Sequence, residues 1–175
     1  MKKLLILIVL FLPLAISAEA VWSPSLGVGA AYSGTVFDAS LDKNETMWPS
    51  PYISAEINPA ALRFDNHIVS LPLSIGYAPS AIINDRMQLQ DSMLLGFDLR
   101  YGYFITDKLL IEGSGGVRYR WYVKASAGAW SAGGGISISF FPFSFMALVL
   151  PVSAYWGEKE LDFSVGLGLR FTLGG

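Results

Sequence analysis

Few residues of this 175-residue sequence could carry out covalent chemistry, because it contains one histidine and no cysteine. His67 is followed closely by Ser70, and hydrolysis by a serine needs a base such as histidine beside the hydroxyl. In a regular strand, however, side chains three positions apart point to opposite faces, so this pair predicts no hydrolytic site. One histidine without cysteine cannot build a zinc site either. We therefore expect no enzyme activity, no cofactor and no metal.

Eight charged residues alternate with apolar neighbours and share the polar face of their segments. They are four acids and four bases, Glu56, Asp98, Arg100, Glu112, Arg118, Arg120, Asp162 and Arg170. A buried charge is costly unless it is paired, so these residues should form ion pairs where that face is enclosed. The cluster could be an ion or ligand site, or a salt-bridged plug. Buried charges are normally paired whatever a protein does, which favours the plug. Arg100 should oppose Glu112 if residues 105–107 form a tight turn, and lie diagonally to it if the turn differs.

The segments that carry these charges have apolar residues at every second position, which is the period of a strand. The pattern is clearest in residues 93–104, 109–123 and 161–173. It recurs in residues 26–37, 52–63 and 68–78, and residues 126–156 fit a hairpin that turns at Phe141-Pro142-Phe143. No helix fits this spacing, and the sequence predicts eight strands.

The composition indicates which side of the strands meets water. Apolar residues make up 53% of the chain, charged residues 15%, and the net charge is −2, which excludes a disordered tail and a nucleic-acid binder. Eighteen glycines and 14% aromatic residues exclude a coiled coil or helical bundle. A soluble sandwich would need more polar residues, so the apolar face should meet lipid. We predict an all-β fold, an eight-stranded antiparallel up-and-down transmembrane β-barrel with both chain ends on one side.

The uncharged run at residues 125–157 is long enough for a spanning helix, but its glycines and prolines would interrupt one. As a hairpin it places Phe143, Phe145, Ala147 and Val149 inside. Either that wall is packed and apolar, or the register differs by one residue. The preceding strand puts small residues inside, which leaves room beside Arg118 and Arg120: Ala127, Ala129, Ser131, Gly133, Gly135, Ser137 and Ser139.

Residues 1–20 have the three parts of a secretory signal peptide. Met1-Lys2-Lys3 is cationic, residues 4–14 are apolar, and residues 15–20 are mostly small. The apolar run is short for a spanning helix, which needs about 20 residues. We expect cleavage after Ala18 or Ala20, export to the bacterial outer membrane, and one barrel domain at residues 21–175.

Aromatic residues gather near the predicted strand ends, as membrane–water interfaces favour. With the mature N-terminus in the periplasm, the outer loops fall near residues 38–50, 79–91, 124–126 and 157–160. The outer aromatic belt is then predicted at Trp48, Trp121, Trp130 and Trp156. The opposite belt is predicted at Tyr103, Phe104, Phe140, Phe143 and Phe171.

Three segments resemble the small eight-stranded outer-membrane β-barrels of the OmpX and OmpW types. Residues 67–77, HIVSLPLSIGY, are similar to a strand with a central Leu-Pro-Leu, although Pro72 removes a backbone donor from the ladder. Residues 103–119 resemble a hairpin with a short periplasmic turn and a glycine-rich return strand. The last strand resembles the signal read by the barrel-assembly machinery, at Ser164, Gly166, Leu169 and Phe171. The resemblance implies this machinery and outer-membrane lipid as partners.

These observations favour a non-enzymatic barrel with a plugged interior and a structural or surface-interaction role. Residues 38–50 and 79–91 are the loops expected to contact a host or cell-surface ligand, since rigid scaffolds commonly carry binding loops. The OmpW-type resemblance implies an alternative, the passage of small hydrophobic molecules, for which Phe143, Phe145 and Val149 would supply an apolar wall. Conductance across a planar bilayer distinguishes the two hypotheses.

Overall fold

Strands account for nearly all of the residues that can be placed. The computed structural model describes residues 21–37, 50–79, 82–83, 87–88, 91–123, 127–157 and 160–173. The expected signal peptide at residues 1–20, Trp48 and most of the two long outer loops lie outside these ranges.

The described strands of the second half of the chain are all long, whereas in the first half only β2 and β3 are longer than six residues. In chain order they are β1 (Val21–Trp22), β2 (Ser25–Phe37), β3 (Ser50–Asn58), β4 (Ala61–Phe64), β5 (His67–Ser70), β6 (Leu73–Ala78), β7 (Ile82–Ile83), β8 (Met87–Gln88), β9 (Ser92–Thr106), β10 (Leu109–Tyr122), β11 (Ala127–Phe143), β12 (Met146–Gly157) and β13 (Glu160–Thr172). β7 and β8 pair only with each other.

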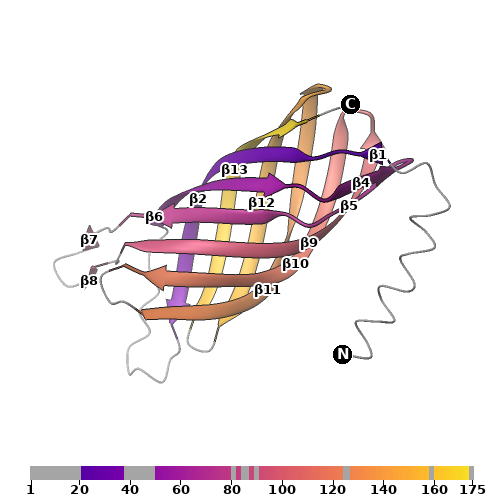
Figure 1. Cartoon of the computed structure of the whole chain (residues 1–175). Helices are drawn as coiled ribbons and strands as arrows, with labels where there is room; N and C mark the ends of the chain where they lie inside the picture. Colours follow the sequence, from indigo (N-terminus) through magenta and orange to yellow (C-terminus); the bar gives the residue numbers. More distant parts are fainter. Residues whose placement is uncertain are drawn as a thin grey trace, which may run out of the picture.

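Eight strands close a barrel, because each is hydrogen-bonded to a neighbour on both sides (Figure 1). Around the wall they are β2, β3, β6, β9, β10, β11, β12 and β13, all antiparallel. Closure occurs where β13 pairs with β2, from Glu160 against Phe37 to Thr172 against Ser25. A closed sheet satisfies its backbone without an edge, which lipid requires. The predicted eight-stranded antiparallel barrel is confirmed.

Short strands extend three neighbouring wall strands beyond proline-containing breaks. Pro24 separates β1 from β2, Pro59 separates β3 from β4, and Pro72 separates β5 from β6. Backbone bonds bridge the breaks: the amide of Leu71 donates to the carbonyl of Ala60 at 3.0 Å, and that of Asp98 to the carbonyl of Pro72 at 3.2 Å. Proline has no backbone N–H to donate, and at Pro72 this donor is absent at a point where the ladder is already interrupted.

The two ends of the barrel are named here by what they carry. The termini end holds β1, Leu173 and the turns at residues 65–66, 107–108 and 144–145, and the opposite end is the loop end. Asp65 has a φ of 50°, and its two-residue turn joins β4 to β5. Asp and Asn adopt this left-handed conformation more readily than other non-glycine residues.

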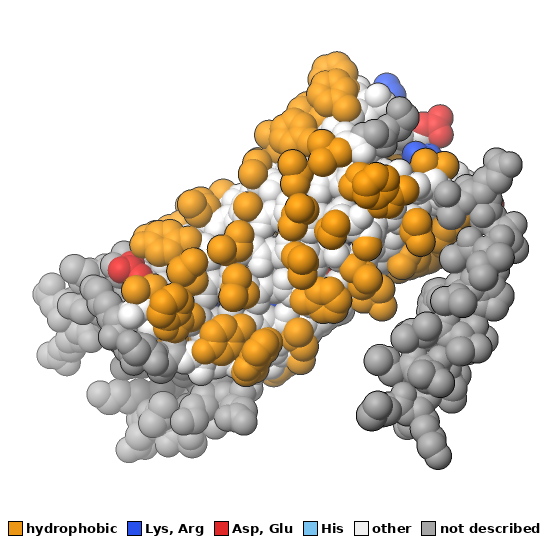
Figure 2. All heavy atoms as spheres, in the orientation of Figure 1, with side chains coloured by type: hydrophobic (Ala, Val, Ile, Leu, Met, Phe, Trp, Pro, Cys, Tyr) orange, Lys and Arg blue, Asp and Glu red, His pale blue; other side chains and the backbone are white. Residues whose placement is uncertain are grey.

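Apolar side chains cover the outside of the wall, and polar side chains face inward. On β9, Phe97 and Leu99 are 47% and 45% exposed, whereas Asp98 between them is 7% exposed. Figure 2 shows hydrophobic side chains spread over the wall, with the charged ones in view only near its two ends. The described residues include no helix that is long and apolar enough to cross a membrane.

The β11–β12 hairpin differs from the prediction in its turn and in its inward set. Phe143 and Phe145 do not line the interior: both are 56% exposed, and their rings stack with centroids 5.6 Å apart. Ala147 and Val149 do face inward, at 0% and 8% exposure. The turn lies at residues 144–145 and the ladder shifts between Phe140 and Phe143, so the inward alternation begins only after Phe145. The predicted turn at Phe141-Pro142-Phe143 is therefore wrong.

Candidate functional site in the barrel interior

One ion pair joins β3 to β9 across the interior. The two terminal nitrogens of Arg100, Nη1 and Nη2, donate to Oε1 and Oε2 of Glu56 at 2.9 and 2.8 Å. The ladder places Arg100 opposite Ser114 and Glu112 opposite Gly102, so Arg100 is diagonal to Glu112. The turn lies at residues 107–108 and not at 105–107, and the ladder shifts by one residue between Leu109 and Leu110. Together these two features produce the diagonal arrangement, and Arg100 pairs with Glu56.

A second ion pair is more deeply buried and joins β10 to β13. Nη1 of Arg170 lies 2.8 Å from Oε2 of Glu112, and the two side chains are 8% and 2% exposed. The same carboxylate oxygen accepts hydrogen bonds from the hydroxyls of Ser137 and Ser139, each at 3.2 Å. The small residues of β11 thus leave room for the charged pair and also supply two of its hydrogen bonds.

A third cluster spans the barrel between β9, β10 and β12. The hydroxyl of Tyr155 donates to Oδ1 of Asp98 at 2.6 Å, and the guanidinium carbon of Arg118 lies 3.6 Å from the centre of the Tyr155 ring. Tyr155 is 1% exposed. Sequence reasoning missed this residue, although it is the one aromatic side chain among the inward positions of β12, after Ala147, Val149, Pro151 and Ser153.

A fourth contact, nearer the loop end, pairs Arg120 of β10 with Asp162 of β13. Nη2 of Arg120 lies 2.8 Å from Oδ2 of Asp162, and both side chains are less than 10% exposed. The eight charged residues singled out in the sequence therefore all face the interior, six in ion pairs and Asp98 and Arg118 around Tyr155. Their arrangement is that of a cross-linked plug with no surplus of either charge.

A layer of tightly packed residues fills the interior at the termini end. Ala61, Leu110 and Ala147 are fully buried, and Phe104 is 6% exposed. Phe104 faces this layer from β9, so its predicted place in the aromatic belt opposite the outer loops, on the lipid-facing surface, is wrong. The guanidinium carbon of Arg63 lies 4.3 Å from the centre of the Phe104 ring. We call the four buried residues Ala61, Phe104, Leu110 and Ala147 the termini-end plug; Arg63 is exposed beside it.

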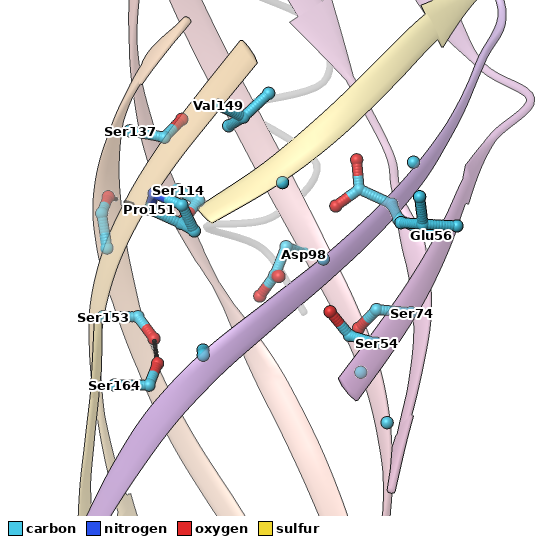
Figure 3. A pocket seen from close by; sticks show the side chains of 18 of the residues that line it. Ser54, Glu56, Ser74, Asp98, Ser114, Ser137, Val149, Pro151, Ser153 and Ser164 are labelled. Carbon is cyan, nitrogen blue, oxygen red and sulfur yellow. Dashed lines mark hydrogen bonds between the residues drawn. The ribbon is translucent and has the colours of Figure 1, made fainter. Parts of the chain in front are cut away.

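A cavity of about 140 Å³ remains inside the barrel. Figure 3 shows the side chains of Glu56, Ser54, Ser74 and Asp98 directed into one space from β3, β6 and β9. Across from them, the hydroxyls of Ser153 and Ser164 are 2.7 Å apart. A polar cavity of this size accommodates several water molecules, each of which occupies about 30 Å³ in the liquid.

Glycines create this space because side chains at their positions would fill it or clash. Gly27, Gly29, Gly76, Gly96 and Gly168 contribute to the lining. At Gly116, outside that set, an added Cβ would meet the Asp98 carboxylate and the backbone of β9. The interior can therefore hold water and fixed charges, but the termini-end plug closes the barrel at the termini end.

Except for Phe104, the described residues of the predicted aromatic belts lie on the outer surface of the barrel. Trp121, Trp130 and Trp156 are 44%, 66% and 62% exposed near the loop end, and Tyr103 is 45% exposed near the termini end. The Tyr119 and Trp130 rings are in contact, with centroids 4.9 Å apart. Phe171 on β13 is half-buried opposite Met146.

The segment predicted as an assembly signal lies in β13. Ser164 faces the interior, Gly166 pairs with Ala31, and Leu169 is exposed on the outside at 37%. The segment thus has regular ladder geometry along β13.

His67 and Ser70 lie on opposite sides of the wall. Ser70 is 1% exposed inside, whereas His67 contacts Tyr101 on the outer face, with Nδ1 2.6 Å from the tyrosine hydroxyl oxygen. Within the described part of the chain, no group of three or more histidine, aspartate or glutamate residues could hold a metal ion.

Solved structures of similar shape include small outer-membrane proteins, each with low sequence identity to this chain. The crystal structure of Ail, the attachment invasion locus protein of Yersinia pestis, matches with a TM-score of 0.62 and 12% identity over 86% of this chain and 98% of that one. Neisserial surface protein A matches with a TM-score of 0.56 and 13% identity over 88% and 99% of the two chains. The outer membrane protein OprG from Pseudomonas aeruginosa matches with a TM-score of 0.51 and 10% identity over 90% and 99%.

Sequence comparisons find no such likeness. No protein-family model matches the chain, and no curated protein matches it. At these identities the structural matches carry the fold, and the chain has the fold of the small eight-stranded outer-membrane β-barrels.

Proposed function

We propose that this protein is a non-enzymatic integral barrel of the bacterial outer membrane, with a plugged interior and outer loops that bind a partner at the cell surface. The observation that carries the proposal is the combination of an apolar outer wall with an interior that is cross-linked and closed. The wall encloses the charged side chains and so keeps them away from the lipid.

The closed interior argues against a role as a channel. Eight strands make a barrel only just wide enough for its own side chains. Here Ala61, Leu110 and Ala147 are fully buried at the termini end, and ion pairs span the space above them. Phe143 and Phe145, on which passage of hydrophobic molecules was to rest, lie outside the barrel. We therefore favour the binding role over transport.

The charged residues of the two long outer loops support a role in surface binding. Residues 38–50 contain Asp38, Asp42, Glu45 and Lys43, and residues 79–91 contain Asp85, Asp91 and Arg86, which makes five acids against two bases. One similar structure is that of Ail with the heparin analogue sucrose octasulfate. The acidic balance of the loops here favours a neutral or cationic partner over a sulfated one.

The location rests on the fold together with the sequence of residues 1–20. We propose that these residues are a signal peptide cleaved after Ala18 or Ala20, and that the β13 segment with Ser164, Gly166, Leu169 and Phe171 directs assembly. Outer-membrane lipid is then the partner of the apolar wall, and the predicted belts of Trp121, Trp130, Trp156 and Tyr103 lie at its interfaces.

Four measurements test the proposal. Outer-membrane fractions should contain a species whose gel mobility shifts on boiling, and protease added to intact cells should cut within residues 38–50. The purified barrel should give no conductance steps in a planar bilayer. Replacing residues 39–47 by a Gly-Ser segment of equal length should abolish adhesion of expressing cells to host cells while the mobility shift persists. Stable conductance, or unchanged adhesion after both loops are replaced, would contradict it.

A further inference from the structure

A cluster of four aromatic side chains lies on the outer face at the termini end. Phe64 and His67 flank the turn at residues 65–66, and Tyr101 and Tyr103 lie on the adjacent strand β9. We call these four residues the rim cluster. The His67 ring stacks on Phe64 with centroids 5.5 Å apart and contacts Tyr103 at 5.1 Å and Tyr101 at 5.8 Å.

The contacts of the rim cluster fix the orientation of the imidazole. Its Nδ1 lies 2.6 Å from the hydroxyl oxygen of Tyr101. When that hydroxyl donates to Nδ1, the ring proton is on Nε2, which becomes a hydrogen-bond donor. Tyr103, 45% exposed, supplies a second donor hydroxyl beside it. These contacts leave two donors on a surface that is otherwise apolar.

A carboxylate accompanies these donors. Asp65 is exposed in the turn between Phe64 and His67. Its neighbour Arg63 places its guanidinium over the Phe104 ring and uses Nε to bond the backbone carbonyl of Asp65. In the described part of the chain no ion pair involves the Asp65 carboxylate. The rim therefore offers donors for an anion next to an acceptor for a cation.

We propose that the rim cluster and Asp65 bind the head group of an amine-bearing phospholipid, a site that rests on the membrane location proposed above. The phosphate would accept from Nε2 of His67 and the hydroxyl of Tyr103, and the primary ammonium would lie near Asp65. Tyrosine faces attract such a cation as well. Belts of this kind lie at head-group level, so both charges of the lipid are within reach.

The described part of the loop end supplies a matched control. Tyr77 is 40% exposed on the outer face, but its hydroxyl donates to Oδ1 of Asp91 at 3.3 Å. Its donor is used within the protein, and removing it should not change lipid preference.

The test measures which lipids stay bound to the intact barrel. The protein is inserted into vesicles of phosphatidylcholine containing equal parts phosphatidylethanolamine and phosphatidylglycerol, extracted into mild detergent, and weighed with its retained lipids by native mass spectrometry. His67→Phe keeps the ring stack and removes the nitrogens, Asp65→Asn keeps the turn and removes the charge, and Tyr77→Phe is the control. Boiling-dependent gel mobility shows that each variant is folded.

We expect the parent and Tyr77→Phe proteins to retain phosphatidylethanolamine several-fold over phosphatidylcholine. His67→Phe should lose retention of both phosphatidylethanolamine and phosphatidylglycerol, and Asp65→Asn should lose only the preference for phosphatidylethanolamine over phosphatidylglycerol. Added inorganic phosphate should not compete, because the lipid chains hold the head group in place. Folded His67→Phe and Asp65→Asn proteins with unchanged preference would overturn this inference, whereas failure of the parent to insert would count against the proposed membrane function.

Discussion

The two halves of the barrel wall are built differently. From β9 to β13 the strands are long, their ladders are nearly unbroken, and they carry every charged interior residue except Glu56. From β1 to β6 the strands other than the 13-residue β2 are shorter, the wall is interrupted at Pro24, Pro59 and Pro72, and the inward residues are mostly glycine, alanine and serine.

This difference shows how a narrow barrel combines rigidity with internal space. The long half supplies cross-links that fill the interior, and the short half supplies small side chains that leave the cavity beside them. We call these halves the charged half and the small half. Changes in the charged half should therefore cost far more stability than changes in the small half.

The largest effect is expected from Arg170→Met in the charged half. It leaves Glu112, 2% exposed, without its cation, and an uncompensated buried charge costs about 3–5 kcal/mol. Urea unfolding of the barrel in vesicles measures the loss. Adding Glu112→Gln to the same chain should recover a large part of it, and a double variant no better than the single one would contradict the pairing.

Leu110→Ala should come next, because it opens a cavity in the fully buried termini-end plug. Substitutions of this kind cost about 2–5 kcal/mol, and this site is walled by strands that cannot collapse easily. The same unfolding assay applies, with the exposed Leu150→Ala as control. Equal losses at the two positions would show that Leu110 does not seal the interior.

Tyr155→Phe should have a smaller effect, because the ring and its contact with Arg118 remain. The hydrogen bond from the hydroxyl to Asp98 is lost, which leaves a buried acceptor and costs about 1–3 kcal/mol. A double-mutant cycle with Asp98→Asn measures the coupling between the two groups. Strict additivity would mean that this contact contributes nothing.

The smallest effect is expected in the small half, from Ser54→Ala. Ser54 lines the cavity, where water can replace the contacts of its hydroxyl, so the unfolding free energy should change by no more than about 0.5 kcal/mol. A loss as large as that for Tyr155→Phe would remove the distinction between the two halves.

Sequence predicted the charged half better than the small half for a physical reason. In β9, β10 and β13 every second residue is apolar over more than ten positions, so strand, face and inward charges such as Asp98 and Arg170 follow from one period. In the small half, prolines interrupt the period, and the breaks at Pro24 and Pro59 emerged only from the structure.

Contacts across the barrel are harder to predict from the sequence than the side of each strand that faces the interior. The alternation predicts that Arg100 and Glu112 face the interior. Their diagonal register, set by the turn at residues 107–108 and the shift beside it, and the pairing of Arg100 with Glu56 are seen only in the structure. Tyr155 and Asp98 are 57 positions apart, and only the closure of the barrel brings them together. Phe143 and Phe145 were assigned inward by extending a period through a turn, where it does not hold.

The central claim, that lipid touches the apolar side of each strand while the other side faces a closed interior, is tested most directly along β13. Because the chain has no cysteine, single cysteines can be introduced at positions 162 to 169 and labelled with a fluorophore before insertion into vesicles of brominated phospholipid. We predict strong quenching at positions 163, 165, 167 and 169 and weak quenching at 162, 164, 166 and 168. Uniform quenching, or the opposite alternation, would contradict the account.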